Sequence, residues 1–431
     1  MIRDYLALPP ARSVHGAVHA PPSKSATNRA LVLAALSEKP VEIVRPLVAG
    51  DTTRLAACLE AMGAVIERTR EGMRVRGPLG SGPGGAIVLL DAGASGTAAR
   101  FLAALASVTP GRYRLTGDAR LLERPIGALV TALRDAGAGI EYDGSDGFLP
   151  LSIRGATLGS GRPLAVDASE SSQFFSALLI AAAALDGGLT VRPLGKVASA
   201  PYVETTVGVL HAFGHEVARG SEGELSVSRG AGGPPRYVVP GDWSSALPFF
   251  AAAGIAGGVV TVTGLEWPSA DADAGALEVV QAMGVTVDPG PGAIRAQADR
   301  GPRTAVAVSA GDFPDAVPAL AALAAFADGE TVFREVGHLR LKESDRIAAV
   351  AGLLQAAGAS AAPAEQEIRI GGPPRPRDGV LRLPTFDDHR IAMAAALLAI
   401  RIPDALIESP GCVAKSYPGF FRDLETILLR G

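Results

Sequence analysis

The tripeptide Asp135-Ala136-Gly137 closes an apolar, helix-like run, and its recurrence decides how the rest of the chain is interpreted. Four further Ala-containing tripeptides that end in Gly close runs of the same kind. Gly is the residue expected just past a helix end, where the backbone turns left-handed. The glycines therefore mark the ends of equivalent helices in a repeating chain. They are Gly63, Gly137, Gly214, Gly284 and Gly358, at spacings of 74, 77, 70 and 74 residues.

Each of these helices is preceded by the same order of elements. A short strand-like run and a polar cluster come first, followed by an Ala- and Leu-rich helix and a second, Gly-bounded strand. After the Gly, alternating segments such as 65–67 and 73–76 predict a hairpin. One repeat is therefore strand, helix, strand, helix and two strands, which predicts a mixed α/β fold. The expected first strands are 86–90, 164–166, 237–239, 306–308 and 381–383.

Six first helices can be counted, and they predict two domains of three βαβαββ repeats each. The segment 1–20 has strand-like residues at 12–14 and 16–19, whereas the last repeat ends without its hairpin. We therefore expect the N-terminal arm to complete the C-terminal domain. Proline-containing segments at the two crossings suit a hinge. The expected domains are 22–238 and 1–21 plus 239–431, with first helices beginning near Ser25, Thr97, Ser172, Ser245, Asp315 and Asp388.

The composition narrows the class of protein. With 431 residues, 48% of them apolar and 19% charged, the chain is typical of a globular protein of about two domains. Its net charge of −4 argues against nucleic acid as the main partner. Cys58 and Cys412 provide neither a disulfide framework nor a zinc-ligand spacing, so they suit a reducing cytoplasm. The N-terminus lacks the long apolar region of a signal peptide.

One uncharged stretch, 243–265, is long enough to span a bilayer. Pro248 and several glycines interrupt it, and Thr261 and Thr263 follow in an alternating pattern. We interpret it as a buried helix, a turn and a strand, so we expect no membrane segment.

Lysine is rare in this chain, and three of its five lysines lie in short polar clusters. Lys24 lies in Ser23-Lys24-Ser25 with Arg29 shortly after it. Lys342 opens a charged run that ends at Arg346, and Lys415 precedes Ser416. In a chain that otherwise favours Arg, these positions suggest a need for a compact, mobile ammonium group.

The polar clusters are expected at one recurring position, the N-terminus of the first helix of each repeat. Helix N-termini carry free N–H groups and partial positive charge, so they bind anions. A single cluster of this kind is more often an ordinary N-cap. Several together predict a site for a ligand with phosphates and carboxylates, because the cations would otherwise repel one another by roughly 1–4 kcal/mol per close pair. The cations are Lys24, Arg124, Arg346, Arg390 and Lys415.

Two acids are candidates for proton transfer. Asp315 follows Pro314, and Glu343 lies between cations in the Lys342–Arg346 run. A site that only binds anions gains nothing from carboxylates among its cations, so the two acids favour an enzyme over a non-catalytic phosphate-binding protein.

The ordered set of motifs resembles the EPSP synthase family, the 3-phosphoshikimate 1-carboxyvinyltransferases, along nearly the whole chain. Each motif alone is weak, whereas their sum in this order is specific. They are Ser23-Lys24-Ser25 with Arg29, Ser95-Gly96-Thr97 with Arg100, Glu123-Arg124-Pro125, Ser171-Ser172-Gln173-Phe174, Pro201-Tyr202, Pro314-Asp315, Lys342-Glu343-Ser344-Asp345-Arg346, Asp388-His389-Arg390 and Ala414-Lys415.

The resemblance implies a two-domain inside-out barrel with its active site in the interdomain cleft, where domain closure excludes water. The implied reaction moves the enolpyruvyl group of phosphoenolpyruvate to the 5-hydroxyl of shikimate 3-phosphate and releases phosphate, in the shikimate pathway of aromatic amino-acid biosynthesis. It needs no metal or organic cofactor. The implied enzyme is a cytoplasmic monomer that binds its two small substrates and neither nucleic acid nor membrane.

The resemblance also implies a role for individual residues. Asp315 is expected to act as base toward the 5-hydroxyl, Glu343 as proton donor, and Lys24 as assistant; the two acids can exchange roles because the adduct must be deprotonated again. The residues expected at shikimate 3-phosphate are Lys24, Ser25, Arg29, Ser171, Ser172, Gln173, Ser199, Tyr202, Asp315, His338 and Lys342. Those expected at phosphoenolpyruvate are Lys24, Gly96, Arg124, Gln173, Arg346, Arg390 and Lys415.

Two positions depart from the family pattern, and one related family is an alternative. Ala94 and His338 each stand where many members carry Asn, which leaves ligand contacts and glyphosate sensitivity open. The alternative is the enolpyruvyltransferase that acts on UDP-N-acetylglucosamine, which typically has Lys-Asn near its N-terminus and a Cys-bearing loop. Here Lys24 precedes Ser25, and Cys58 lies in an expected helix, so we favour the first family.

Overall fold

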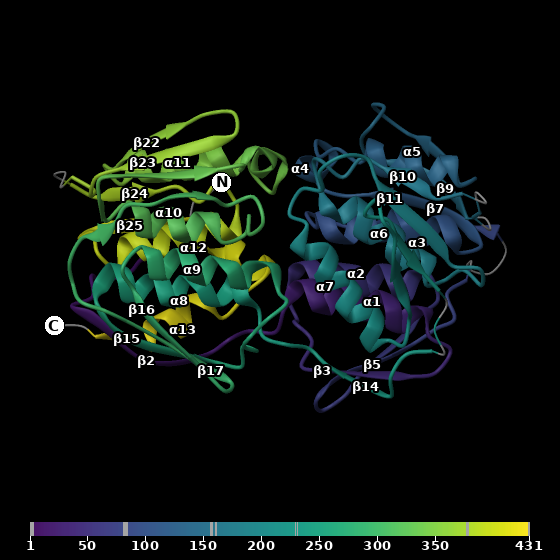
Figure 1. Ribbon diagram of the computed structural model, residues 1–431, viewed down its shortest axis with the longest axis horizontal. Helices are drawn as coiled ribbons and strands as arrows, with labels where there is room; N and C mark the ends of the chain where they lie inside the picture. The colour runs from purple at the N-terminus through teal and green to yellow at the C-terminus, as the bar shows by residue number, and fades with distance from the viewer. Residues whose placement is uncertain are drawn as a thin grey trace. The chain divides into compact units, whose positions relative to one another are not determined.

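The computed structural model describes residues 4–80, 85–155, 158–159, 162–228, 230, 232–375 and 379–429. The chain divides into two compact units (Figure 1). The N-unit is Pro22–Val239, and the C-unit is Met1–Pro21 together with Pro240–Gly431. Each unit has a hydrophobic core of its own.

The middle repeat of the N-unit consists of β6 (Ile87–Asp91), α3 (Gly96–Val108), β7 (Gly111–Thr116), α4 (Ala119–Leu122), α5 (Gly127–Asp135), β8 (Gly139–Tyr142) and β9 (Leu151–Gly155). β6 and β7 are parallel, because a helix connects them, and β9 and β8 continue the sheet antiparallel. The sheet order is β6-β7-β9-β8. Except for the additional short helix α4, this is the predicted order of elements.

The flanking repeats of the N-unit have the same plan. The first comprises α1 (Lys24–Leu36), β3 (Val41–Val44), α2 (Gly50–Ala61), β4 (Val65–Arg68), β5 (Gly72–Arg76) and, from the end of the unit, β14 (Arg236–Val238). The third comprises β10 (Leu164–Val166), α6 (Ser172–Ala182), β11 (Leu189–Pro193), α7 (Pro201–Ala212), β12 (Val217–Arg219) and β13 (Leu225–Val227). Their sheets are β14-β3-β5-β4 and β10-β11-β13-β12.

The C-unit repeats the plan with help from both ends of the chain. Its sheets are β16-β17-β15-β2-β26, β19-β21-β23-β22 and β1-β25-β24, with the small pair β18-β20. The strands are β1 (Tyr5–Ala7), β2 (Ser13–His19), β15 (Gly258–Thr263), β16 (Thr286–Gly290), β17 (Ala293–Ala298), β18 (Arg303–Thr304), β19 (Ala307–Ser309), β20 (Ala327–Asp328), β21 (Glu330–Arg334), β22 (Ser360–Pro363), β23 (Glu367–Gly371), β24 (Leu381–Leu383), β25 (Ala405–Glu408) and β26 (Leu428–Leu429). The helices are α8 (Trp243–Ala256), η2 (Ala272–Gly275), α9 (Ala276–Ala282), α10 (Val317–Ala324), η3 (Gly337–Leu341), α11 (Arg346–Ala356), α12 (His389–Ala399), η4 (Pro410–Lys415) and α13 (Phe420–Glu425).

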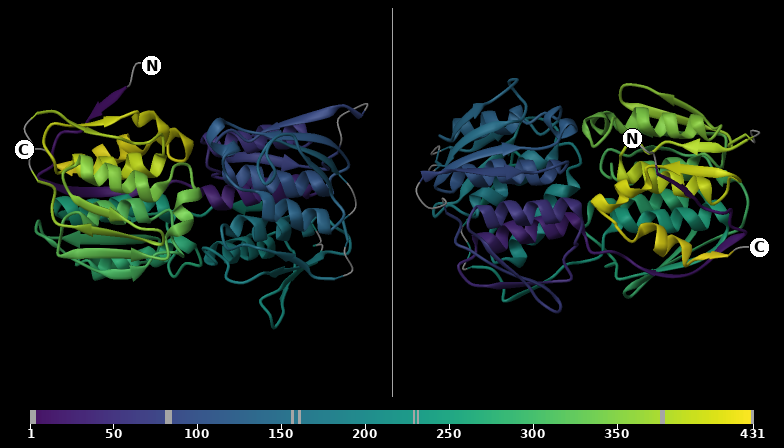
Figure 2. Two further views of the ribbon diagram at one scale, coloured as in Figure 1. Left: turned by 90° about the horizontal axis from the view of Figure 1, so that it is seen from above. Right: turned by 180° about the vertical axis from the view of Figure 1, so that it is seen from behind.

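In each unit, the strand that comes just before the first helix along the chain belongs to a sheet of the other unit. β2 of the N-terminal arm lies parallel to β15, and β1 pairs with β25, so the arm completes the C-unit as expected (Figure 2). The strand at 237–239 was expected to open the fourth repeat, and this is wrong: β14 lies parallel to β3 in the N-unit. The Val239 N–H continues that pairing to the Val44 carbonyl, and Val239 is buried in the N-unit core. The expected boundary after residue 238 therefore lies one residue too early.

The first helix of each repeat lies inside its unit, with the sheets around it (Figure 1). α8, α10 and α12 pack against one another in the C-unit, and α3 and α6 do so in the N-unit. Every residue of α8, α10 and α12 is buried, as expected of helices that are apolar on all sides.

The glycines expected after the second helices have left-handed backbones. Their φ angles are 102° at Gly63 and Gly137, 79° at Gly214, 89° at Gly284 and 86° at Gly358. A residue with a Cβ rarely adopts these angles, which explains why Gly recurs there. These positions confirm the repeat read from the sequence.

The apolar stretch 243–265 is the buried helix α8 followed by the strand β15, as predicted. Among the described residues, no helix has the length and hydropathy to cross a membrane.

Candidate active site

Arg346 at the start of α11 is the centre of a buried charge cluster in the C-unit. Its Nε donates to Asp388 Oδ2 at 2.8 Å, its Nη1 to Asp315 Oδ1 at 2.6 Å, and its Nη2 to Glu343 Oε2 at 2.8 Å. Asp388 also accepts from the hydroxyl of Ser344 at 3.0 Å. One guanidinium thus fixes three carboxylates that come from different segments of the unit.

Arg390, in the first turn of α12, has a different environment. Its Nη2 donates to Ser244 Oγ, and its Nη1 donates to Ser245 Oγ at 3.2 Å. Two carboxylates lie farther from Nη2, Asp315 at 3.6 Å and Asp242 at 3.9 Å. The residue is 2% exposed, so the serines at the start of α8 hold a buried cation.

The two predicted acids each lie between two cations. Asp315 faces Arg346 and Arg390, and Glu343 faces Arg346 and Lys415, whose Nζ donates to Glu343 Oε1 at 3.2 Å. Because each carboxylate has two cationic neighbours, its ionised form is stabilised.

The arginines are held in their charged form. Burial would lower the pKa of Arg346, but the charges of Asp388, Glu343 and Asp315 outweigh it and raise that pKa well above its usual value. The sequence predicted that the cations repel one another without a ligand. In the C-unit this is wrong, because carboxylates of the protein compensate Arg346, Arg390 and Lys415.

His338 in η3 lies in the same cluster. Burial, together with the charge of Lys342, lowers the pKa of His338 to about 3, against the opposing effect of Asp315. The imidazole is therefore neutral at physiological pH and can offer a ligand a neutral hydrogen bond, as an amide would. Lys342 itself lies at the end of η3.

In the N-unit, Arg29 is fixed by hydrogen-bond acceptors along its whole guanidinium. Its Nε donates to Thr206 Oγ1 at 2.8 Å, its Nη1 to the Ser25 carbonyl at 3.1 Å, and its Nη2 to the Tyr202 carbonyl at 3.2 Å. The guanidinium also lies over the ring of Phe101, 5.4 Å from its centroid. These contacts bring the starts of α1 and α7 together.

Two further predicted cations of the N-unit, Lys24 and Arg124, are buried. Lys24 Nζ lies 3.4 Å from Asp51 Oδ2, and both side chains are nearly inaccessible. Gly96 lies directly against Arg124: a Cβ at Gly96 would approach the Arg124 Nη2 to 2.6 Å. A side chain at residue 96 would therefore displace the Arg124 guanidinium from the start of α3.

The start of α6 supplies the remaining polar groups. Ser171 caps the helix by accepting from the Gln173 N–H at 3.2 Å, and the Gln173 amide donates to Thr97 Oγ1 at 3.1 Å. Ser172 is buried beside them, and Ser199, before α7, has a left-handed φ of 52°.

The predicted site residues therefore form two groups, one in each unit. The expectation that their clusters all lie at first helices is wrong at three places. Arg124 precedes α5, the Lys342–Arg346 run leads into α11, which begins at Arg346, and Lys415 ends η4. These are second helices or later segments, so cations reach the site from both helices of a repeat.

Sequence reasoning missed several residues that hold the predicted ones in place. Asp51 pairs with Lys24, Thr206 with Arg29, and Ser244 and Ser245 with Arg390. The one available signal was the position of the serines in a helix-start cluster. Asp51 and Thr206 lie in ordinary helical sequence and gave no signal.

Cys58 lies in α2 as expected, and burial raises the pKa of its thiol to about 11. Such a thiol is a poor nucleophile. Among the described residues, no three His, Cys, Asp or Glu side chains form a group that could hold a metal ion.

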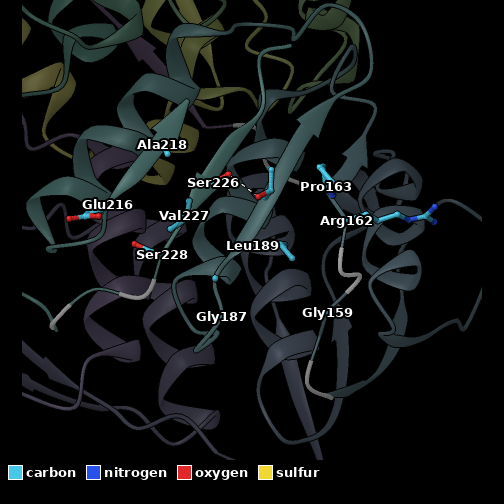
Figure 3. Close-up of a pocket in the computed structure, with 12 residues that line it drawn as sticks. Gly159, Arg162, Pro163, Gly187, Leu189, Glu216, Ala218, Ser226, Val227 and Ser228 are labelled. Carbon is cyan, nitrogen blue, oxygen red and sulfur yellow. Dashed lines mark hydrogen bonds between the residues drawn. The ribbon is translucent and has the colours of Figure 1, made fainter. Parts of the chain in front are cut away.

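A hollow of about 490 Å³ lies on the β10–β13 sheet of the N-unit (Figure 3). The hydroxyls of Thr190 and Ser226 meet there at 2.8 Å, and Arg162 and Glu216 are its charged groups. None of the predicted site residues lines it.

Comparisons with known proteins agree along the whole chain. A family model described as EPSP synthase (3-phosphoshikimate 1-carboxyvinyltransferase) matches residues 9–424. A relative of that name from Thiobacillus denitrificans is 39% identical over 422 residues, which cover 97% of this chain and 98% of the relative. Another, from Methanoculleus marisnigri, is 38% identical over 412 residues, with 95% and 96% covered.

Solved structures show the same similarity. An EPSP synthase from Acinetobacter baumannii superposes with a TM-score of 0.77 at 26% identity, covering 99% of this chain and 98% of that one. An enolpyruvyl transferase from Streptomyces tendae has a TM-score of 0.75 at 22% identity, with 98% and 96% covered, which shows the fold alone.

Proposed function

The chain belongs to the EPSP synthase family, and from this premise we propose that it transfers the enolpyruvyl group of phosphoenolpyruvate to the 5-hydroxyl of shikimate 3-phosphate. The products are 5-enolpyruvylshikimate 3-phosphate and phosphate. The observation that carries the proposal is the family match over residues 9–424, within which the cationic and acidic motifs occur in order.

We assign the ligand-binding groups by unit. The N-unit groups for shikimate 3-phosphate are Lys24, Ser25, Arg29, Ser171, Ser172, Gln173, Ser199 and Tyr202, and the C-unit groups are Asp315, His338 and Lys342. Those for phosphoenolpyruvate are Lys24, Gly96, Arg124 and Gln173 with Arg346, Arg390 and Lys415. Both substrates are polyanions, which matches the cations among these groups.

The reaction needs a base and an acid. The 5-hydroxyl oxygen must lose its proton as it bonds to the central carbon of phosphoenolpyruvate, while the methylene carbon gains a proton. The adduct then loses phosphate and one methyl proton. We propose Asp315 as the base, because its contacts with Arg346 and Arg390 favour the ionised form that accepts a proton.

Glu343 is the proposed proton donor, and its contacts suggest how it acquires a proton. Arg346 and Lys415 now stabilise its carboxylate. A bound phosphoenolpyruvate anion would take hydrogen bonds from these cations and add negative charge beside Glu343. Both effects favour protonation of the carboxyl group. Lys24, paired with Asp51, is proposed to assist by stabilising charge that develops in the transition state.

We also propose that the enzyme works as a monomer in the cytoplasm. Both cysteines are free, which suits a reducing compartment.

The test is a phosphate-release assay on the purified protein. Phosphoenolpyruvate is supplied with shikimate 3-phosphate in one reaction and with UDP-N-acetylglucosamine in another. We expect release only with shikimate 3-phosphate. Release only with the UDP-sugar would move the protein to the related family, and release with neither would refute the proposed transfer.

A further inference from the structure

The two buried arginines of the C-unit differ in what accepts their hydrogen bonds. Arg346 donates directly to three carboxylates, those of Asp388, Asp315 and Glu343. Arg390 donates to the hydroxyls of Ser244 and Ser245 and contacts the Met393 sulfur at 3.9 Å. Its positive charge is thus less fully compensated by direct contacts than that of Arg346.

The two serines are themselves held firmly at the start of α8. Ser244 donates to Asp242 Oδ1 at 2.7 Å, and the same oxygen caps the helix by accepting from the Ser245 N–H at 2.8 Å. All three side chains are buried. Because Asp242 receives the Ser244 proton, the Ser244 oxygen is free to accept from Arg390.

One nitrogen of Arg390 has no hydrogen-bond partner among the described residues. This nitrogen is Nε, and it is buried. A buried donor without an acceptor costs stability, so such donors in native proteins usually serve a ligand or a water molecule. Each serine accepts from one terminal nitrogen and so fixes the plane of the guanidinium, and the buried Nε–H is available to an anion.

We infer that Ser244 and Ser245 are positioning residues for phosphoenolpyruvate, which they orient through Arg390; this rests on the proposed function. As neutral acceptors they fix the guanidinium without adding a negative charge. Asp242 acts through Ser244 and belongs to the same chain of hydrogen bonds. The other charged groups that face Arg390 are Asp315, Asp273 and Arg346.

The chain carries a spectroscopic reporter at this place. It has two tryptophans, and Trp243 lies between Asp242 and Ser244 in sequence. Trp243 is 1% exposed, and its ring is 5.8 Å from that of Trp267. Tryptophan fluorescence should therefore change when an anion binds at Arg390.

The decisive variant is Ser244→Ala/Ser245→Ala in the full-length protein. Hydrogen bonds to a charged group contribute more free energy than those between neutral groups. We therefore expect the KM for phosphoenolpyruvate to rise about ten- to a hundredfold. The KM for shikimate 3-phosphate should stay within about twofold, because only one substrate depends on Arg390 in this way. Ser244→Thr keeps a hydroxyl at this position, so its KM for phosphoenolpyruvate should be much closer to that of the wild type than the KM of the double variant is.

Ser107→Ala is the matched control. Ser107 is a fully buried serine in α3 whose hydroxyl donates to the Ala103 carbonyl at 2.8 Å, away from the predicted site residues. It should lower the melting temperature and leave both KM values unchanged. An unchanged phosphoenolpyruvate KM in the double variant, or equal losses for both substrates, overturns the positioning role. If the double variant fails to fold, Ser245→Ala alone is assayed, and its KM values for the two substrates are compared in the same way.

Failure of the proposed function is a separate outcome. If the wild type releases no phosphate, phosphoenolpyruvate is titrated into wild type and variant while tryptophan fluorescence is followed. A dissociation constant at least about tenfold weaker in the variant supports the positioning role. Equal constants, or no fluorescence change in either protein, overturn it.

Discussion

At the scale of single residues, the C-unit cluster shows how acids and cations share a site. Asp315 and Glu343 flank the same guanidinium, that of Arg346, so each is oriented by a side chain that cannot lose its own charge. A ligand that competes for Arg346 must therefore alter both acids. Under the proposed roles of the two acids, ligand binding and proton transfer are coupled through Arg346.

Glu343→Gln and Lys24→Ala should each reduce kcat by about 10²–10⁴-fold. The first removes the proposed proton donor, and the second removes a cation proposed to stabilise charge that develops in the transition state. The Glu343 variant should keep the fold, since Gln is nearly isosteric with Glu. Steady-state phosphate release measures the effect, and circular dichroism checks the fold. The controls are Lys39→Ala and Glu278→Gln, which alter exposed residues. Near-normal turnover in either site variant would remove that residue from the mechanism.

His338 should make stability depend on pH. Its pKa is lowered to about 3 in the folded protein, whereas an unfolded His titrates near 6.5. Between about pH 3 and pH 6.5 only the unfolded state binds a proton at this imidazole. The free energy of unfolding is therefore highest above pH 6.5 and decreases as the pH falls toward 3, by at most about 1.4 kcal/mol per pH unit. His338→Gln should therefore lose less stability between pH 7 and pH 5, as measured by urea unfolding.

His15→Gln is the control for that experiment, because His15 is exposed. It should show the same loss between pH 7 and pH 5 as the wild type. An identical pH dependence in the wild type and the His338 variant would show that His338 titrates alike in both states.

At the scale of elements, the left-handed glycines separate the ends of second helices from the strands that follow. Gly137 has a φ of 102°, and a Cβ placed there would meet no atom within 4 Å. Gly208 in α7 also has open space but has an ordinary helical backbone. The two positions thus differ in backbone conformation and not in crowding.

Gly137→Ala should destabilise the protein by about 1–2 kcal/mol, because Ala resists a left-handed backbone. Gly208→Ala should stabilise it by about 0.5–1 kcal/mol, because Ala is the better helix former. Thermal unfolding of both variants gives the comparison. Shifts of the same sign would show that backbone conformation is not what selects Gly137.

At the scale of the whole molecule, the N-unit is continuous in sequence and the C-unit is not. β14 completes the first sheet of the N-unit from its own chain end, whereas the C-unit requires β1 and β2 from the arm. The N-unit also has its own core. It therefore contains every strand that its sheets need.

A fragment of residues 22–239 should fold alone, with a cooperative urea transition followed by circular dichroism. It should release no phosphate, because Asp315, Glu343, Arg346 and Arg390 belong to the C-unit. A fragment of residues 22–235 should be markedly less stable, because it lacks β14. Equal stability of the two fragments would show that β14 is dispensable to the N-unit.

Much of the fold followed from local signals. Gly63, Gly137 and the other helix-ending glycines need only their own backbone conformation to be recognised, so the repeat was readable before any tertiary contact was known. The expected strand at 237–239 was placed in the wrong sheet, because its pairing with β3 depends on residues almost 200 positions away. Local pattern cannot specify a partner at that distance.

Local sequence is sufficient to recognise the repeat, the family and the cationic and acidic residues of the candidate site. The groups that fix these residues depend on the fold: Asp51 for Lys24, Thr206 for Arg29, and Ser244 and Ser245 for Arg390. The reason is physical. Helix ends and charged clusters are properties of neighbouring residues, whereas a buried charge is stabilised by whatever side chains the fold brings within a few ångströms.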